Sequence, residues 1–351
     1  MEILEIKDDK KEEWDNFVRG HKYGHFLQSY EWGEVVLADG EKIKRLAVFE
    51  KGKMIAVSVI IIYALPLKKS YLYIPRGPVL DWDKITESRK INQDQEALMM
   101  ILDEVKKIGG DENSLFLRID PEIESANNDK KFWQQIGFRK SSKEVQPERT
   151  ICLDLSKSED QLLSGMKSKT RYNVRLSLRK GVKIKASIEV KDVDSFYDLT
   201  IKTSRRDGFY PHAKKHYQDI IKILGPKGLA KLFLVTYKGK VIAATIISFF
   251  GQKAIYMHGA SDNEQRNLMS TYLLQWQAIL EAKKMGCKLY DFGGVVPETE
   301  TGHSWVGISR FKRGFGGNEY QYIGAWDLPY SPSQYKLFSL TANIRRKIKK
   351  A

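Results

Sequence analysis

The sequence predicts a mixed α/β (α+β) chain that holds two tandem copies of one domain. The first observation is a strand–loop–helix–strand series in the second half, at 254–258, 259–269, 270–285 and 288–292. The second is a matching strand–helix–strand series in the first half, at 71–74, 93–108 and 115–119. The third is a hairpin before each series, with turns at Lys51-Gly52 and Lys238-Gly239. This order indicates an internal duplication.

Helices and strands surround the series in the first half. Acidic residues predict a short helix at 9–18, and Ser29 is a suitable N-cap for a second helix. Gly109-Gly110 is expected to end the long helix, and a short helix follows at 131–138. Period-two alternation predicts the hairpin strands 44–50 and 53–63.

The second half follows the same plan. Its long helix is expected to be capped by Ser270 or Thr271 and to end at Gly286 in a left-handed conformation. The other elements expected are helices at 166–182, 191–204 and 213–224 and strands at 230–237, 240–250 and 319–326.

A last helix carries Leu337, Leu340 and Ile344 on one face, followed by basic residues. We expect this face to pack on the first domain rather than to lie on a membrane. The predicted boundaries are therefore residues 1–148 plus 317–351 for domain 1 and 149–316 for domain 2.

Strand, loop, long helix and strand form the central unit of an N-acyltransferase (GNAT-like) fold. In the versions that use coenzyme A, glycines in the loop let backbone N–H groups hold pyrophosphate at the helix N-terminus. Here the loop reads SDNEQRNLM and contains no glycine, and the first half lacks a glycine loop as well. The scaffold predicts acyl transfer, while the loop argues against acyl-coenzyme A as the donor.

Composition indicates a globular protein with an anionic partner. The 351 residues are 42% hydrophobic and 11% aromatic, enough for two cores. Lys and Arg number 59 against 44 Asp and Glu, a net charge of +15. Nucleic acid, a nucleotide-linked substrate or an anionic lipid surface would suit this charge, and a merely soluble basic protein would too.

The chain reads as a reduced, cytoplasmic protein. Its two cysteines, Cys152 and Cys287, lie in apolar strand-like runs and indicate no disulfide framework. The N-terminus does not resemble a signal peptide, and the longest apolar run, 54–65, is too short to cross a bilayer. The histidines show no metal-ligand spacing, so neither metal nor cofactor is expected.

A basic helix at 166–182 is the first candidate site. It carries six cations and no acidic residue, and among them Lys167, Lys169, Arg171 and Arg175 are expected to bind phosphate or tRNA. An ordinary solvated helix face is the alternative.

Two loops and two strand ends are further candidates. Arg206 and Tyr210 lie in TSRRDGFYPH, where a guanidinium and a phenol suit a diphosphate and a sugar or peptide carbonyl, or merely form a capped turn. The segment ISRFKRGFGG places Lys312 among aromatic residues and glycines, and a structural hairpin is the alternative. Asp120 and Asp291 end corresponding strands, where each could accept a proton or serve a turn.

Taken together, RYNVRLSLRKGV, TSRRDGFYPH, the 256–279 block, YDFGGV and FKRGFGGNEYQYIG resemble the FemABX family of aminoacyltransferases. The resemblance extends to FLQSYEWGEVV and so spans nearly the whole chain. It implies two acetyltransferase-like domains, with a C-terminal segment that returns to the first. It also implies an aminoacyl-tRNA donor, which accounts for the missing glycine loop. The acceptor would be a stem-peptide amine of a peptidoglycan precursor, either UDP-MurNAc-pentapeptide or lipid II.

The resemblance also implies residue roles. Arg206, Tyr210, Tyr256 and Trp32 would bind the acceptor, and Phe311 and Lys312 would serve the tRNA end and the developing oxyanion. Asp120 matches an acid considered as a base. Val36 stands where some members with soluble acceptors have a lysine, and no room exists between Gly181 and Asp291 for a helical-hairpin arm.

We therefore expect a cytoplasmic transferase of cell-wall biogenesis and cell shape, with a possible peripheral contact at the inner membrane face. In its reaction an amine attacks the ester carbonyl of aminoacyl-tRNA, and positioning supplies most of the acceleration. Three alternatives stay open: an acyl-coenzyme A transferase, a transferase for a non-wall amine, and a non-catalytic tRNA-binding protein. The residues favour no particular amino acid and neither acceptor form.

Overall fold

The computed structural model describes residues 1–87, 92–125 and 130–348. The chain divides into two compact units, Met1–Glu148 with Tyr322–Ala351, and Arg149–Gln321. Each unit holds one seven-stranded sheet among the described residues. The predicted mixed α/β class, with two tandem units built on one sheet each, is thus confirmed.

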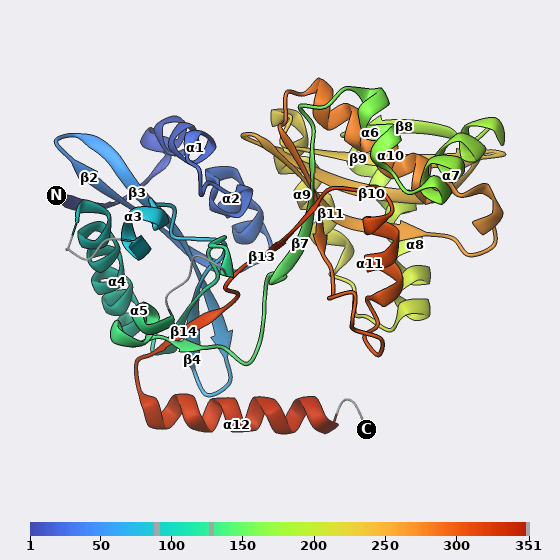
Figure 1. Ribbon diagram of the computed structural model, residues 1–351. Coiled ribbons are helices and arrows are strands. Elements are labelled where there is room, and N and C mark those ends of the chain that lie inside the picture. The colour runs from blue at the N-terminus through green and yellow to red at the C-terminus, as the bar shows by residue number, and fades with distance from the viewer. Residues whose placement is uncertain (88–91, 126–129, 349–351) are drawn as a thin grey trace. The chain divides into compact units, whose positions relative to one another are not determined.

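Unit 1 is a twisted sheet in the order β1-β2-β3-β4-β5-β14-β6, where β4 and β5 are parallel and the other pairs are antiparallel. Figure 1 shows α4 on one face and α1 with α2 on the other, so that β3 is buried for most of its length. The strands are β1 (Glu2–Glu5), β2 (Lys42–Glu50), β3 (Lys53–Leu65), β4 (Lys69–Ile74), β5 (Ser114–Ile119), β6 (Arg139–Lys140) and β14 (Trp326–Pro329). The helices are α1 (Lys11–Gly20), α2 (Tyr30–Ala38), α3 (Trp82–Glu87), α4 (Gln93–Asp111), α5 (Lys130–Gln135) and α12 (Pro332–Ile348).

Unit 2 repeats this plan in the order β13-β7-β12-β11-β10-β9-β8, with β11 and β12 as its parallel pair. Its strands are β7 (Arg149–Asp154), β8 (Lys183–Ser187), β9 (Ala230–Tyr237), β10 (Lys240–Phe250), β11 (Lys253–Ser261), β12 (Leu289–Gly294) and β13 (Asn318–Gln321). Its helices are α6 (Glu159–Gly165), α7 (Ser168–Arg179), α8 (Val193–Asp207), α9 (Lys214–Leu224), α10 (Ser270–Lys284) and α11 (Val306–Arg313). The long helices α4 and α10 each connect the two parallel strands of their own sheet.

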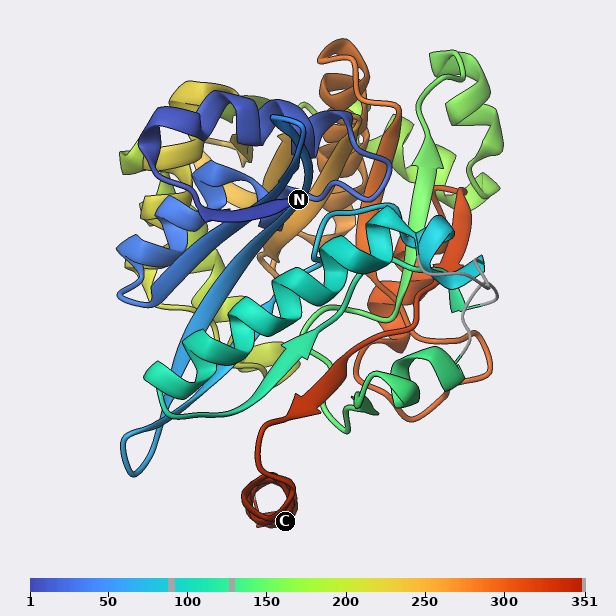
Figure 2. The ribbon, with the colours of Figure 1, turned by 90° about the vertical axis from the view of Figure 1, so that its left-hand side faces the viewer.

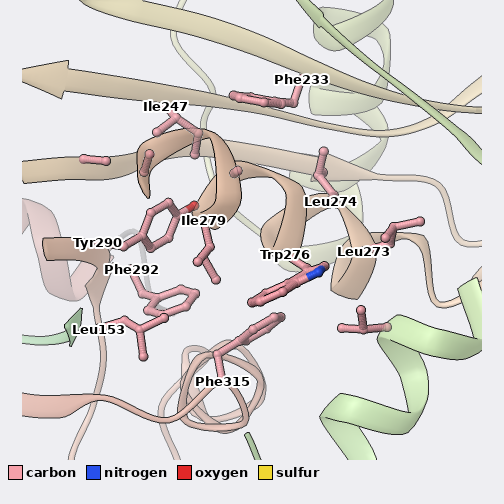
Figure 3. Packing of buried hydrophobic residues seen from close by; sticks show 14 of the residues in the cluster. Leu153, Phe233, Ile247, Leu273, Leu274, Trp276, Ile279, Tyr290, Phe292 and Phe315 are labelled. Carbon is pink, nitrogen blue, oxygen red and sulfur yellow. The ribbon is translucent and has the colours of Figure 1, made fainter. Parts of the chain in front are cut away.

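An aromatic and aliphatic cluster fills the core of unit 2 (Figure 3). Trp276 of α10 faces Phe292 of β12, and Phe315 lies just below them. The ring centroids of Phe292 and Phe315 are 5.3 Å apart. This packing ties the end of α11 to the parallel strands, and the burial of such large rings is the main stabilising contribution there.

Helices begin and end largely where local chemistry predicts, but the structure corrects two helix ends and one strand. Ser29 caps α2 by accepting a hydrogen bond from the Trp32 N–H, as predicted. The predicted cap of α10 is wrong: Met269 is the N-cap, at φ +52, and it makes no side-chain cap bond. The predicted end of α4 is wrong as well: the helix continues through Gly109-Gly110 to Asp111, and the Tyr330 ring packs where a Gly109 side chain would stand.

The third correction concerns the strand predicted at 319–326. The segment forms two strands in separate sheets, β13 beside β7 and β14 beside β5. Gly324 lies between them at φ +67, a left-handed conformation that interrupts an extended chain. Figure 2 shows β14 leading into α12, which this view shows end-on below the sheet of unit 1.

Helix α12 contacts unit 1 through a face other than the predicted one. Tyr335 and Phe338 pack on Phe116 of β5, with ring centroids 5.4 and 5.3 Å apart. Leu337 and Leu340 are 64% and 53% exposed. The side chain of Ile344 lies outside the described residues.

Candidate functional site

The candidate site of unit 2 begins where β11 and β12 separate. The two strands pair only from Lys253 to Ile255 of β11, whereas β12 stays paired with β7 as far as Gly294. The pairing of β12 with β7 is irregular between Asp291 and Gly294, with Gly293 at φ +70. Tyr256, one residue past the last parallel pair, therefore lies at the opening between the strands.

Lys312 occupies this opening. Helix α11 carries it inward, so that the residue is only 7% exposed, and its Nζ donates a 2.7 Å hydrogen bond to the carbonyl oxygen of Gly294. The same nitrogen lies 5.6 Å from the centroid of the Tyr256 ring. Burial lowers the pKa of Lys312 to about 8, while the charge of Asp291 acts in the opposite direction. A lysine with such a pKa can stabilise an oxyanion or supply a proton near neutral pH.

The helix α11 replaces the hairpin that was an alternative for ISRFKRGFGG. Residues 306–313 contain one glycine and continue a helix, whereas Gly316 and Gly317, at φ +86 and +93, end the segment. Phe311 precedes Lys312 and packs edge to face on Tyr272 of α10, with centroids 5.0 Å apart.

A cavity of about 600 Å³ lies beside this group, entirely within unit 2. Tyr256, Phe311 and Arg206, all expected from the sequence, line it together with the first turn of α10. Met269, the N-cap residue of α10, makes no side-chain hydrogen bond to the N–H groups of that turn. A positive helix end and two arginines, Arg206 and Arg266, suit an anionic or strongly polar ligand group.

Arg206 is held at the cavity rim by several acceptors. Its Nε and its terminal nitrogen donate to Asp207, at 2.6 and 2.7 Å, and another terminal nitrogen donates to the Ser261 carbonyl and to Asn263. The hydrogen bond to Asp207 raises the pKa of Arg206. Tyr210 lies on the following segment, is 93% exposed and does not line the cavity.

Two expected residues lie in unit 1. Asp120 is fully buried and accepts hydrogen bonds from the Tyr73 hydroxyl and the backbone N–H groups of Arg76 and Gln146. Burial raises its pKa. These contacts fix the backbone after β4 and β5. Trp32 is half-buried on α2, with its ring 5.1 Å from Phe26 in an edge contact.

The basic residues of α7 divide into two kinds. Arg171 donates to the carbonyl oxygens of Leu163, Ser164 and Met166, so it completes the C-terminus of α6. Lys167, Lys169 and Arg175 are exposed. Arg171 therefore stabilises the fold, whereas the three exposed residues can bind an anionic ligand from solvent.

Two residues of the site were not predicted from the sequence. Gly294 supplies the carbonyl oxygen that accepts the hydrogen bond of Lys312, and the hydroxyl of Thr150 donates to Asp291. Also not predicted was a cluster in which the rings of His212, His216 and His258 lie 4.3 to 6.0 Å apart. The spacing of His212 and His216 was visible, but the register of β11 was needed to add His258. Among residues 1–87, 92–125 and 130–348, no set of His, Cys, Asp and Glu side chains is arranged to hold a metal ion.

Membrane crossing was searched over the same described ranges. None of the helices there combines the length and the apolar character that a bilayer span requires. Between residues 181 and 291, all of them described, the longest helices have 15 residues, so the segment holds no long hairpin arm.

Comparisons with known proteins agree with this architecture. The FemAB family profile matches residues 10–135, 132–238 and 230–343. A lipid II:glycine glycyltransferase of Staphylococcus haemolyticus is 26% identical over 411 aligned positions, which cover 96% of this chain and 95% of the relative. The enzyme of the same name from Staphylococcus aureus (strain COL) is 24% identical, with 96% and 95% covered. Because 411 positions exceed the 351 residues here, the first relative has residues without a counterpart in this chain.

Solved structures show the same fold. A crystal structure of FemX superimposes with a TM-score of 0.85 and 24% identity, covering 97% of this chain and 100% of the other. A tandem GNAT protein from the clavulanic acid biosynthesis pathway gives a TM-score of 0.56 at 11% identity, covering 94% and 99%.

Proposed function

Because this chain belongs to the FemAB family of transferases, we propose that it moves an amino acid from aminoacyl-tRNA to the stem-peptide amine of a peptidoglycan precursor. The names of the curated relatives support lipid II as the acceptor, and UDP-MurNAc-pentapeptide is the soluble counterpart. The product is an amide of the interpeptide bridge, together with free tRNA. The observation that carries this proposal is the buried Lys312 at the separated strands, beside a cavity large enough for a substrate end.

The reaction needs no covalent intermediate. The neutral amine attacks the ester carbonyl carbon, the tetrahedral oxyanion forms, and the ribose oxygen of the tRNA leaves as the new amide bond is completed. The Lys312 ammonium would stabilise the oxyanion and pass one proton to the departing ribose oxygen, and its nitrogen would then take back the proton that the attacking amine loses as the amide forms. An electrostatic donor of this kind contributes about 10²–10³-fold in rate.

The cavity would hold the reacting substrate end. The N–H groups at the start of α10, with Arg206 and Arg266, would attract phosphate or carbonyl oxygens. Phe311 and Tyr272 would provide an aromatic surface for a base or a sugar. Exposed Lys167, Lys169 and Arg175 would contact the backbone of the tRNA. Tyr210 and Trp32 would bind the acceptor, and Asp120 would act as a base on the acceptor side, as the family resemblance implies.

The proposed place of action is the cytoplasmic side of the membrane, where lipid-linked precursors are made. The exposed Leu337 and Leu340 of α12 would be the residues that touch lipid. Sedimentation with anionic vesicles tests this contact: a Leu337→Ser/Leu340→Ser variant should bind less, and equal binding would refute it.

The direct test of function is a transfer assay with purified protein and a pool of charged tRNAs. UDP-MurNAc-pentapeptide and lipid II are offered separately as acceptors, and acetyl-coenzyme A replaces the tRNA in a parallel reaction. The proposal predicts product only with charged tRNA. Product with acetyl-coenzyme A would instead support the coenzyme A alternative, and tRNA binding without any product would support a binding protein.

A further inference from the structure

We propose that Asp291 is a positioning residue for Lys312: it shapes the turn that holds the lysine and supplies the charge that keeps the side chain an ammonium ion. The proposal rests on the proposed role of Lys312 in transfer. It assigns Asp291 no proton transfer to or from substrate.

The carboxylate of Asp291 organises the backbone where β12 leaves β11. Its Oδ1 accepts a 2.7 Å hydrogen bond from the N–H of Gly293 and a further one from the hydroxyl of Thr150 on β7. Gly293 adopts φ +70, and β12 meets β7 again at Gly294, which is paired with Thr150. The turn directs the Gly294 carbonyl oxygen to the Nζ of Lys312.

Gly293 also lies near the lysine. A Cβ atom on Gly293 would stand 3.8 Å from the Nζ of Lys312 and 3.4 Å from the backbone oxygen of Tyr256. The positive φ disfavours any other residue at this position. The Asp291–Gly294 segment therefore holds the carbonyl oxygen to which the Lys312 ammonium donates.

The charge around Lys312 comes from few groups. Asp291 on β12 is the carboxylate that raises the lysine pKa, and Tyr256 on β11 presents its ring face, with the pKa of its hydroxyl raised by burial to about 12. On α11 itself, Arg313 is turned away to the Val296 carbonyl and to Glu319. Asp291 thus opposes the loss of the lysine proton that burial favours.

This balance matters for chemistry because only the ammonium form can neutralise an oxyanion or give a proton to a leaving oxygen. With its pKa near 8, Lys312 is mostly protonated at neutral pH. Without the negative charge of Asp291, the pKa of Lys312 would be lower and a larger fraction of the side chain would be the neutral amine at the same pH.

The test is Asp291→Asn, which keeps the acceptor oxygen for Gly293 and Thr150 but removes the charge. Lysine labelled with ¹³C at Cε reports each amine by NMR, and the signal missing from Lys312→Met identifies Lys312. We expect its titration midpoint to fall by about one pH unit or more in Asp291→Asn. A folded Asp291→Asn protein with an unchanged midpoint would overturn the proposal.

Thr150→Val is the matched control, since it removes one hydrogen bond to Asp291 without changing charge. The titration midpoint of Lys312 in this variant should stay at the wild-type value. In transfer assays the alkaline limb of the pH–rate profile should move to lower pH for Asp291→Asn. A purely structural role would lower the rate equally at every pH. If the midpoint moves but wild type transfers nothing, the proposed function fails while the coupling stands; if wild type transfers and the midpoint is fixed, only the Asp291 inference fails.

Discussion

The side-chain nitrogen of Lys312 lies 2.7 Å from the carbonyl oxygen of Gly294, at the point where the two parallel strands of unit 2 part. The parallel pairing of β11 and β12 ends at Asp291, so β11 offers no backbone partner to the carbonyl oxygen of Gly294. The buried ammonium of Lys312 donates a hydrogen bond to this oxygen instead. The same contact places a cation beside the cavity in which a substrate end can lie.

Burial of Lys312 should have a measurable thermodynamic signature. The pKa falls from 10.5 to about 8 on folding, so between these values the unfolded chain binds a proton that the folded chain does not. Stability contributed by this group therefore rises with pH across that window, by about 3 kcal/mol. The free energy of unfolding of wild type relative to Lys312→Met, from urea denaturation at pH 7.5 to 10, should increase accordingly. A difference that is constant with pH would contradict the buried titration.

Gly259 should be needed for the shape of the site. A Cβ atom there would stand 1.9 Å from the Tyr256 hydroxyl oxygen, so Gly259→Ala must displace the ring on which Lys312 rests. We expect a loss of about 1–3 kcal/mol in stability and a tenfold or greater fall in transfer. Gly165→Ala is the control, because nothing lies within 4 Å of its added carbon. Equal activity of the two variants would argue against a role for Tyr256.

The exposed and the bonded cations of the basic helix should behave differently. Lys169→Ala and Arg175→Ala should weaken tRNA binding and reduce its salt dependence, each without lowering the thermal midpoint. Arg171→Ala should lower the midpoint by several degrees, because three carbonyl oxygens of α6 lose their donor. Filter binding at two salt concentrations and calorimetry separate these effects. Lys169→Ala with full tRNA affinity and an unchanged salt slope would remove α7 from the binding surface.

Much of the fold could be predicted from the sequence because periodicity and turn chemistry are local. The hairpin around Lys238-Gly239 forms between strands 230–237 and 240–250 as expected, and Gly286 follows α10 at φ +84. The prediction of one strand at 319–326 was wrong because the two halves of this segment join different sheets, which depends on long-range pairing. Leu337 and Leu340 have helical spacing, yet spacing does not say which face finds a partner.

The candidate site was predictable in its residue types and only partly in its geometry. Phe311, Tyr256 and Arg206 line one cavity of unit 2, and Lys312 lies beside the Tyr256 ring, an arrangement that the chain order alone did not reveal. Arg171 looked like a phosphate ligand because charge is visible in sequence, whereas its three backbone acceptors are not. The role of Asp291 depends on the irregular pairing of β12 and β7, which requires coordinates.

The most direct measurement is single-turnover transfer from charged tRNA by wild type, by Lys312→Met and by Lys240→Met, an exposed lysine changed in the same way. The account predicts that Lys312→Met loses about 10²-fold or more in rate while it still binds tRNA and keeps its fold. Lys240→Met should match wild type. A Lys312→Met protein that transfers at the wild-type rate would contradict the central claim.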